Sequence, residues 1–362
     1  MINKYDNILR FLGGNMESAK KSLLQIQQAK KIAIITHYNP DADAIGSMIA
    51  LKRLIKKNFE TQKRPLFVDI FTQVEKLDDK YQPLTYGENL NIQHFKRYDL
   101  AIAVDCSDIN RLGKFKKIFS KAKCTINIDH HETNTKFAKN NIVAKNCSSS
   151  AEILYLLYCK VFKLNFSADI CSLLYSGIIT DTNNLTQNIS NNTLKVVSEL
   201  TEKCRQDSYN LEAIRNHFFK SNTKEQLTLL SRALESITFA ESGKIAMMKL
   251  VKNDFTQTNT TQDDTLGIVD YSCTIQGVEI GIIFIKQEDN TYYVSLRSKK
   301  EVDVGKIAHS MGGGGHKNVA AFKTKEDDNL TDIKTKLISL CKTELEKQEE
   351  NTENIEDLFA EI

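Results

Sequence analysis

The chain has 362 residues, of which 41% are hydrophobic and 26% charged, and a formal net charge of +3. These values are typical of a soluble globular protein that is long enough for two ordinary domains. No run of about 18 apolar residues is present, which argues against a membrane-spanning helix. Residues 1–14 lack the pattern of a secretory signal, so we expect a cytoplasmic protein.

The first half of the chain alternates short apolar runs with helical patterns. Strands are predicted over residues 31–36, 66–71, 99–105 and 124–129, and helices over 45–55, 150–162 and 171–180. Alternation of strands and helices is typical of a parallel sheet that is covered on both faces. We therefore predict an α/β domain over residues 1–192.

The second half follows a different pattern. Residues 193–236 are polar with helical spacing, and we predict a helical connector there. Strands are then predicted over 243–250, 277–287 and 291–298, and helices over 304–311 and 330–345. The last two strands are separated by residues 288–290, which suit a hairpin loop. This pattern predicts a smaller mixed α/β domain over 237–345.

The distribution of charge and the spacing of the cysteines argue against several classes of protein. Residues 343–362 contain eight acidic residues and one basic residue, so the body of the chain is modestly basic. A basic body suits a small anionic substrate, but the absence of Trp and of a long basic stripe argues against long nucleic acid. Residues 346–362 are predicted to be an acidic, solvated helix or frayed end. The eight cysteines form no CxxC pair, which favours buried thiols over zinc knuckles or disulfides.

Four polar clusters follow apolar runs in the first half. They are His37-Tyr38-Asn39-Pro40-Asp41-Ala42-Asp43, Asp105-Cys106-Ser107-Asp108, Asp129-His130-His131 and Thr180-Asp181-Thr182. Each cluster alone is more often a turn, a helix cap or a surface pair than a site. However, three of them end predicted strands, and ligands of open parallel sheets bind at the carboxyl ends of the strands. We therefore expect these side chains to meet at one edge of the sheet.

So many carboxylates close together would repel one another unless cations were present. Carboxylate and imidazole ligands without a thiolate favour Mn²⁺, and they also suit Mg²⁺, Co²⁺ or Zn²⁺. A bridging carboxylate would hold two ions ~3.5–4 Å apart, which is the arrangement used for phosphoester cleavage. The clusters therefore predict a site for two divalent metal ions.

A glycine-rich segment in the second half offers an anion-binding element. It reads Met311-Gly312-Gly313-Gly314-Gly315-His316. Glycines let backbone N–H groups approach an anion without obstruction from side chains. Arg297, at the end of a predicted strand, could bind a phosphate with two hydrogen bonds. The glycine-rich segment alone could equally be a flexible loop with one exposed histidine.

Taken in order, these motifs resemble the DHH phosphoesterase superfamily. The resemblance rests on His37-x-x-Pro40-Asp41-x-Asp43-x-x-Gly46-Ser47, Val104-Asp105, Asp129-His130-His131 and Thr180-Asp181-Thr182. Residues 295–298 and 312–316 resemble the DHHA1 domain of this superfamily. The similarity covers residues 15–342, and the nearest subgroup is that of the NrnA-like bifunctional oligoribonucleases and pAp phosphatases. Leu266-Gly267 departs from the Glu-Gly pair that often stands there in the family.

The resemblance implies a fold, a reaction and a set of residue roles. The fold is a parallel-sheet DHH domain and a smaller mixed α/β DHHA1 domain, with the active site in the cleft between them. The reaction is hydrolysis of short oligoribonucleotides or 3′-phosphoadenosine 5′-phosphate (pAp) to mononucleotides. A homodimer is one assembly that family members form.

The resemblance also assigns the site. His37, Asp41 and Asp105 would bind one ion, and Asp43, Asp105, His130 and Asp181 would bind the other, with Asp105 as the bridge. His131 would contact the substrate phosphate, and Asp129 would support the histidines. These three residues, Asp105, Asp129 and His131, are the expected catalytic group. The remaining substrate contacts would come from Arg297, Ser298, Gly313, Gly314, Gly315 and His316.

Other functions are also compatible with these motifs. A cyclic-di-AMP or linear-dinucleotide phosphodiesterase would use the same catalytic core. A family II inorganic pyrophosphatase shares the motifs of the first domain, although the glycine-rich segment favours DHHA1. A non-catalytic nucleotide-binding regulator would have lost metal ligands, and every expected ligand is present.

Overall fold

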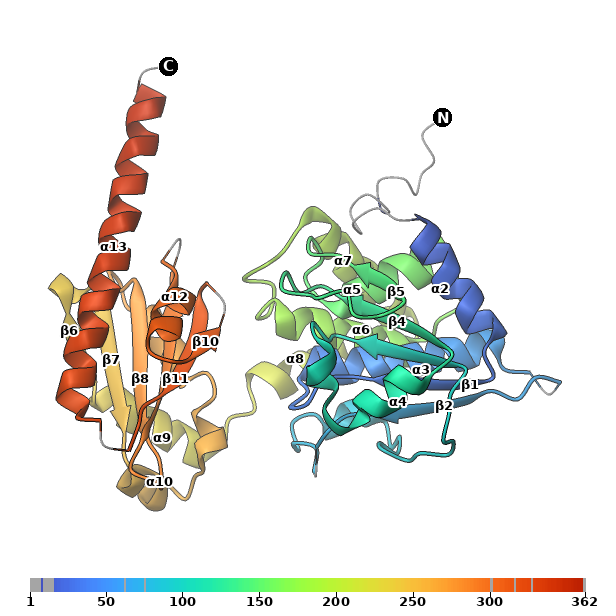
Figure 1. Ribbon diagram of the computed structural model, residues 1–362, viewed down its shortest axis with the longest axis horizontal. Coiled ribbons are helices and arrows are strands. Elements are labelled where there is room, and N and C mark those ends of the chain that lie inside the picture. The colour runs from blue at the N-terminus through green and yellow to red at the C-terminus, as the bar shows by residue number, and fades with distance from the viewer. Residues whose placement is uncertain are drawn as a thin grey trace. The chain divides into compact units, whose positions relative to one another are not determined.

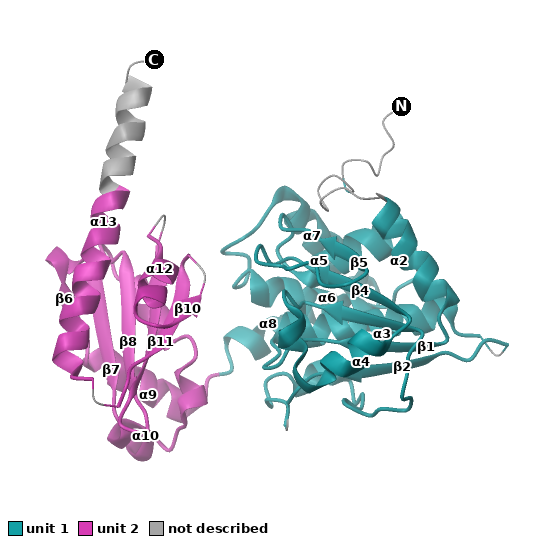
Figure 2. Ribbon diagram, viewed as in Figure 1, with its two compact units in different colours: residues 1–221 teal, residues 222–362 magenta. Residues whose placement is uncertain are grey.

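The structure is a computed structural model that describes residues 8, 16–61, 63–74, 76–299, 302–315, 317–326 and 328–360. The chain divides into two compact units, residues 1–221 and 222–362 (Figure 2). The predicted helical connector is divided between them, since two of its helices belong to unit 1 and one to unit 2. Each unit is therefore described by itself.

Unit 1 is built on a five-stranded parallel sheet (Figure 1). Its strands are β1 (Lys31–Ile35), β2 (Phe67–Phe71), β3 (Leu100–Val104), β4 (Cys124–Asp129) and β5 (Asn140–Val143). The strand order is β2-β1-β3-β4-β5, and every neighbouring pair is parallel. The first four strands were predicted and are confirmed. Strand β5 was missed because its first two residues are asparagines, which are uncommon in strands.

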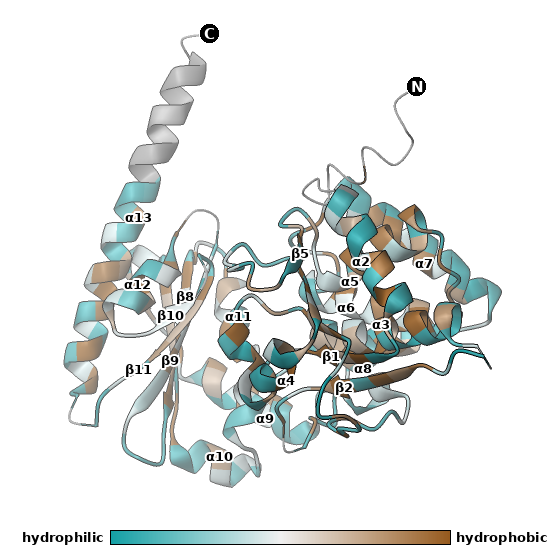
Figure 3. Ribbon diagram, turned by 45° about the vertical axis from the view of Figure 1, so that its right-hand side comes forward, coloured by the Kyte–Doolittle hydropathy of each residue, from teal (hydrophilic) through white to brown (hydrophobic). Residues whose placement is uncertain are grey.

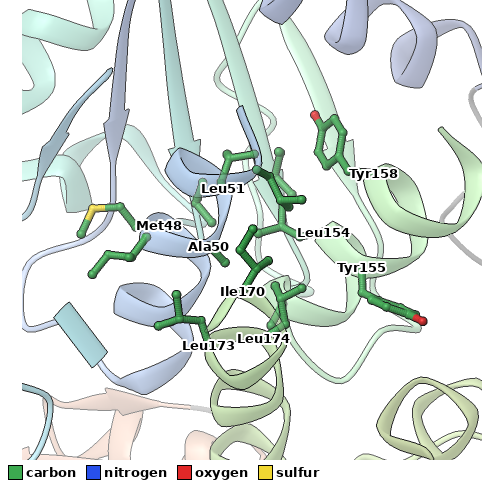
Figure 4. Close-up of a cluster of buried hydrophobic side chains, with 14 of the residues drawn as sticks. Met48, Ala50, Leu51, Leu154, Tyr155, Tyr158, Ile170, Leu173 and Leu174 are labelled. Carbon is green, nitrogen blue, oxygen red and sulfur yellow. The ribbon is translucent and has the colours of Figure 1, made fainter. Parts of the chain in front are cut away.

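Helices cover both faces of this sheet. One face carries α3 (Ala42–Phe59), α5 (Ser150–Leu154), the π-helical turn η3 (Tyr155–Val161) and α6 (Ala168–Asp181). The other carries the short helices η2 (Ile109–Phe115) and α4 (Lys116–Lys121). Neighbouring residues of a strand point to opposite faces, so Ile34 joins the first layer and Ile35 the second. Figure 4 shows the first layer, in which Leu51 of α3, Leu154 of α5 and Leu173 of α6 lie in one apolar cluster.

Four further elements belong to the described part of unit 1. They are α2 (Met16–Gln28), η1 (Gln82–Thr85), α7 (Asn191–Gln206) and α8 (Leu211–Phe219). Helix α2 packs on the same apolar layer through Ile26, and α7 does so through Val196 and Leu200. Unit 1 therefore has one large core on the α3–α6 side of its sheet and a smaller one on the other side.

Helices α3 and α6 pack closely and run antiparallel. A Cβ atom on Gly46 would lie 2.8 Å from the carbonyl oxygen of Leu173, and one on Gly177 would collide with the Asp43 carboxylate. Both positions therefore require glycine for a close backbone approach. The contact brings the first turn of α3 beside the last turns of α6.

Unit 2 has a six-stranded mixed sheet. Its strands are β6 (Thr238–Ala240), β7 (Ile245–Leu250), β8 (Ile280–Lys286), β9 (Tyr292–Ser298), β10 (Gly314–Gly315) and β11 (Val319–Lys323). The order is β10-β11-β9-β8-β7-β6, and only the β7–β8 pair is parallel. Strands β7, β8 and β9 and the hairpin between the last two were predicted and are confirmed.

The helices of unit 2 cover its sheet from two sides. They are α9 (Lys224–Glu235), α10 (Lys252–Thr258), α11 (Ile268–Cys273), α12 (Val304–Ser310) and α13 (Leu330–Ala360), with the short turns η4 (Glu241–Gly243) and η5 (Gln262–Thr265). Helices α12 and α13 bury apolar residues on one face, and α9 and α11 on the other. Accordingly, the described part of α13 carries both hydrophobic and hydrophilic residues in Figure 3.

The predicted fold class is confirmed: a parallel-sheet α/β unit is followed by a smaller mixed α/β unit. All eight cysteines are free, and six of them are buried, as predicted. Within the described ranges, no helix combines the length and the apolar character that crossing a bilayer requires.

Candidate active site

Asp105 lies at the centre of the polar cluster of unit 1. It follows the last residue of β3 with a positive φ of 55°, and only 1% of its side chain is exposed. Its Oδ2 atom is 3.4 Å from Nε2 of His37, and its Oδ1 atom is 3.5 Å from Nε2 of His130. The two oxygens of one carboxylate therefore face two different histidines.

The first group of ligand atoms consists of His37, Asp41 and Asp105, which offer atoms within 4.8 Å of one another. His37 follows β1, and its Nδ1–H donates to the Tyr38 carbonyl oxygen at 2.7 Å. This bond leaves Nε2 as the ring atom that faces Asp105. Asp41 is the N-cap of α3, and its Oδ1 accepts from the Ala44 amide at 2.9 Å.

The second group consists of Asp43, His130 and Asp181, whose atoms also lie within 4.8 Å of one another. His130 follows β4, and its Nε2 is 3.3 Å from Oδ2 of Asp181, the last residue of α6. Because Oδ1 of Asp105 is close to the same His130 nitrogen, this carboxylate adjoins both groups.

Asp43 is fully buried and is held by the start of α5. Its Oδ2 accepts from the Ser150 amide at 2.7 Å, and its Oδ1 accepts from the Ala151 amide at 3.0 Å. The Ser47 hydroxyl, one turn further along α3, donates to the same Oδ1 at 3.0 Å. These donors stabilise the carboxylate in one orientation.

His131 is fixed by a chain of hydrogen bonds. Its Nδ1–H donates to Oδ1 of Asp129 at 2.7 Å, and Nδ2 of Asn134 donates to the other Asp129 oxygen at 2.6 Å. Asp129 itself is fully buried at the end of β4. A third candidate group joins Asp105, His130 and His131 within 4.8 Å. The geometry therefore also allows His131 to contribute to a metal site.

The pKa values of the groups in this cluster are shifted because several carboxylates lie close together. Burial and the nearby Asp105 carboxylate raise the pKa of Asp43 to about 7, and burial with the Asp43 carboxylate raises the pKa of Asp181 well above its usual range. Burial also opposes ionisation of Asp105, but His130 and His37 hold the pKa of that carboxyl well below its usual range. Burial lowers the pKa of His130, yet Asp105 and Asp181 outweigh it and raise the value to about 10.

The donor set fits divalent metal ions. Carboxylates and imidazoles converge at the carboxyl ends of three parallel strands, and Cys106, the thiol next to Asp105, instead donates to the Asp108 carbonyl oxygen. Burial and neighbouring carboxylates raise the pKa values of Asp43 and Asp181, and bound cations would offset this repulsion. Hard and intermediate divalent ions prefer such oxygen and nitrogen ligands.

In unit 2, the predicted substrate residue Arg297 is held by an ion pair and a hydrogen bond. It lies near the end of β9, where its Nε donates to Oδ1 of Asp270 at 2.7 Å and its Nη1 to the Leu296 carbonyl oxygen at 3.0 Å. Arg297, Gly314 and Gly315 line an open pocket of about 340 Å³, together with the exposed side chains of Leu266 and Tyr293.

The other predicted substrate residues have different surroundings. The Ser298 hydroxyl donates to the Val302 carbonyl oxygen at 2.7 Å, and Ser298 does not line the pocket. A Cβ atom on Gly313 would collide with the backbone of β11, so this glycine is required for hairpin packing. Gly314 has open space around it. His316 lies outside the described residues.

Sequence reasoning did not anticipate several partners of these residues. Ser47, Asn134 and Ser150 each hold one of the carboxylates, and Asp270 holds Arg297. Ser150 left a signal, since the run Ser148-Ser149-Ser150 before a helix is typical of an N-cap. Ser47 stood in the first motif without a role assigned to it. The contacts of Asn134 and Asp270 depend on the tertiary fold.

The fold and this set of carboxylates and imidazoles are those of a metal-dependent phosphoesterase. The chain contains a DHH and a DHHA1 domain: the model of the DHH family N-terminal domain matches residues 31–178, and the model of the DHHA1 domain matches residues 242–343. The two matches contain the motifs named above except Thr180-Asp181-Thr182, which lies just beyond the first match.

Alignments with relatives whose names state an activity cover most of this chain. It is 27% identical over 303 residues to the bifunctional oligoribonuclease and PAP phosphatase NrnA of Thermus thermophilus, covering 81% of this chain and 84% of that protein. It is 22% identical to the cyclic-di-AMP phosphodiesterase PdeA of Listeria monocytogenes, over 94% of this chain and 53% of that protein. An exopolyphosphatase-related protein from Bacteroides fragilis has the same fold, with a TM-score of 0.78, 19% identity and coverage of 92% and 96% of the two chains.

Proposed function

We propose that the protein hydrolyses short oligoribonucleotides and pAp to mononucleotides with the help of two divalent metal ions, of which Mn²⁺ is the favoured one. The observation that carries this proposal is the placement of Asp105. One of its oxygens faces His37 and the other faces His130, so a single carboxylate adjoins both ligand groups. The names of the NrnA relatives supply the substrate class.

The proposed ligands follow the two groups. His37, Asp41 and Asp105 would hold one ion, and Asp43, Asp105, His130 and Asp181 the other. When bound, two such ions would lower the pKa of a water molecule and stabilise negative charge on the phosphoryl oxygens. Mg²⁺ and Co²⁺ suit the same donors.

The chain's own groups orient the substrate. The Asp129 carboxylate holds the His131 ring through Nδ1, and the ring would stabilise charge that develops on the phosphate oxygens. In unit 2, Arg297 and the glycine segment at 313–316 would bind the part of the substrate beyond the phosphate that is cleaved. The exposed Tyr293 beside Arg297 offers an apolar surface for a base.

A substrate panel tests the proposal. The purified full-length protein is stripped with a chelator, supplied with Mn²⁺, and assayed on pAp, 5′-phosphorylated RNA dinucleotides, pApA, cyclic-di-AMP and pyrophosphate. We expect release of mononucleotides or phosphate from pAp and the linear dinucleotides at rates at least about tenfold above the others. A clear preference for pyrophosphate, or binding without any turnover, would overturn the proposal.

A matched pair of variants tests the bridging role. Asp105→Asn keeps the shape of the side chain but removes its charge, and we expect kcat to fall on the order of 10³-fold. Asp108→Asn is the control, because this residue caps η2 three positions later and belongs to neither ligand group. Mn²⁺-dependent activity that survives Asp105→Asn would exclude the bridge.

Cyclic-di-AMP hydrolysis is the alternative function, and the similarity to PdeA supports it. It predicts that the rate on cyclic-di-AMP exceeds the rate on pAp in the same panel. The proposal also includes a cytoplasmic location, with no role for long nucleic acid, and it is compatible with a monomer or a homodimer.

A further inference from the structure

Ser150, the first residue of α5, connects two of the proposed metal ligands. Its amide donates to Oδ2 of Asp43 at 2.7 Å, and its hydroxyl donates to Oδ1 of Asp105 at 3.1 Å. Ser150 is fully buried. A single residue thus contacts a carboxylate from α3 and a carboxylate from the end of β3.

The position of Ser150 is fixed by the turn before it. Ser149 is the N-cap of α5, and its hydroxyl oxygen accepts from the Glu152 amide at 3.1 Å. The buried Glu152 carboxylate accepts from the amide and the hydroxyl of Ser148, both at 2.8 Å, and from the Thr193 hydroxyl at 3.1 Å. Because the start of α5 is held on both sides, the Ser150 hydroxyl is presented to Asp105 in a defined direction.

The hydrogen bond from Ser150 limits rotation of the Asp105 carboxylate. A carboxylate on a short side chain turns readily about its Cβ–Cγ bond unless its oxygens are held. Ser150 holds Oδ1 on the side of His130, which leaves Oδ2 on the side of His37. One lone pair of Oδ1 is used by the serine, and the others remain for a cation.

We propose that Ser150 is a positioning residue that orients Asp105 so that each carboxylate oxygen serves one of the two metal sites. This inference rests on the proposed function, because it assumes that both groups bind ions. It assigns to the Ser150 hydroxyl a role in metal binding that is separate from the capping of α5, which Ser149 performs.

Two neighbouring serines give a matched test. Ser150→Ala removes the hydroxyl that contacts Asp105 and keeps the amide that contacts Asp43. Ser149→Ala removes a buried hydroxyl of the same size that caps the helix and contacts neither carboxylate. Loss of an N-cap destabilises a helix, so the control carries a comparable or larger loss of stability.

The readout is Mn²⁺ binding, followed by the electron paramagnetic resonance signal of free Mn²⁺, together with activity on pAp. For Ser150→Ala we expect affinity for one of the two ions to fall about 10–100-fold, and the Mn²⁺ concentration for half-maximal activity to rise accordingly. The KM for pAp at saturating Mn²⁺ should stay within about twofold. Ser149→Ala should lower the melting temperature but change Mn²⁺ affinity less than about threefold, because Ser148 and Thr193 still hold the start of α5 through Glu152.

The outcomes separate the two proposals. If the unaltered protein binds fewer than two Mn²⁺ ions, the two-ion function fails. If it binds two and Ser150→Ala binds them equally well, only the positioning role fails. An equal loss of Mn²⁺ affinity in Ser149→Ala would also overturn that role, because a general disturbance of α5 would then explain it. Melting curves in the presence of a chelator verify that both variants fold.

Discussion

Two central carboxylates of unit 1 and the arginine ion pair of unit 2 differ in their exposure to water. In unit 1, Asp43 and Asp105 are buried, and their oxygens are held by amide or hydroxyl donors. In unit 2, Arg297 is 19% exposed, and its partner Asp270 is 58% exposed. Gly314 and Gly315, which share a pocket with Arg297, are also exposed.

We infer from this contrast that unit 1 acts mainly in catalysis and metal binding and unit 2 mainly in substrate binding. Charges that are buried and fixed before a ligand arrives give strong, preorganised electrostatic stabilisation. An exposed ion pair contributes little by itself and exchanges partners easily. We therefore expect changes in unit 1 to lower kcat and metal affinity, and changes in unit 2 to raise KM. The following predictions test that separation.

The largest effect is expected for Asp43→Asn. Both Asp43 oxygens accept from donors, so an asparagine NH₂ group would face another N–H and remain unsatisfied. The substitution also removes a ligand charge, and we expect kcat to fall on the order of 10³-fold at saturating Mn²⁺. The exposed Asp207→Asn is the control. A change in KM alone would contradict the proposed division.

The next effect is expected for Gly177→Ala. The added methyl group would collide with the Asp43 carboxylate and the Ala151 side chain. We expect a loss of about 1–3 kcal/mol of stability and a fall of about 10²-fold in kcat through displacement of Asp43. Chemical denaturation and steady-state kinetics measure the two effects. Ser176→Ala, at the adjacent buried position of α6, should leave kcat within about threefold.

In unit 2, Arg297→Ala should act on substrate binding. A charge-assisted hydrogen bond to a phosphate contributes about 1.5–3 kcal/mol, so KM for pAp should rise about 10–100-fold while kcat changes less than about threefold. Arg232→Ala removes another arginine of unit 2, one that pairs with Glu235 on the surface, and serves as the control. A fall in kcat with unchanged KM would place Arg297 in the chemical step instead.

The smallest effect is a pH dependence of metal binding. The raised pKa values of Asp43, to about 7, and of His130, to about 10, mean that the metal-free site holds protons near neutral pH. Metal ions must displace these protons, so affinity for Mn²⁺ should rise about tenfold from pH 6 to pH 7 for each proton that is displaced. Calorimetry in two buffers of different ionisation enthalpy measures the release. Binding that is independent of pH would contradict this charge distribution.

Prediction from the sequence succeeded where the local pattern determines the structure. Strands β1 and β3 are almost entirely apolar, β4 alternates apolar with polar residues, and each of the three is followed by a polar cluster. Their parallel arrangement follows from the alternation with helices. Strand β5 was missed because an edge strand with Asn140 and Asn141 lacks that pattern. The order of the motifs also predicted that Asp105, His130 and Asp181 belong to one site, and the structure places them within a few ångströms.

The contacts that hold the site residues in place could not be predicted from local sequence patterns. The bond from Ser150 to Asp105 joins positions 45 residues apart, and it depends on the exact start of α5. The pair of Arg297 and Asp270 likewise depends on the packing of α11 against β9. Such contacts are set by tertiary structure, and a single sequence carries no direct signal for them.

The close contact of α3 and α6 determines which changes in sequence unit 1 can tolerate. At Gly46 the two helices touch without an intervening side chain, so the start of α3, with Asp41 and Asp43, and the end of α6, with Asp181, form one rigid framework. The separation of these carboxylates is therefore independent of the length of the loops that leave the two helices. Insertions in those loops should be tolerated, whereas one added methyl group in the helix interface should not.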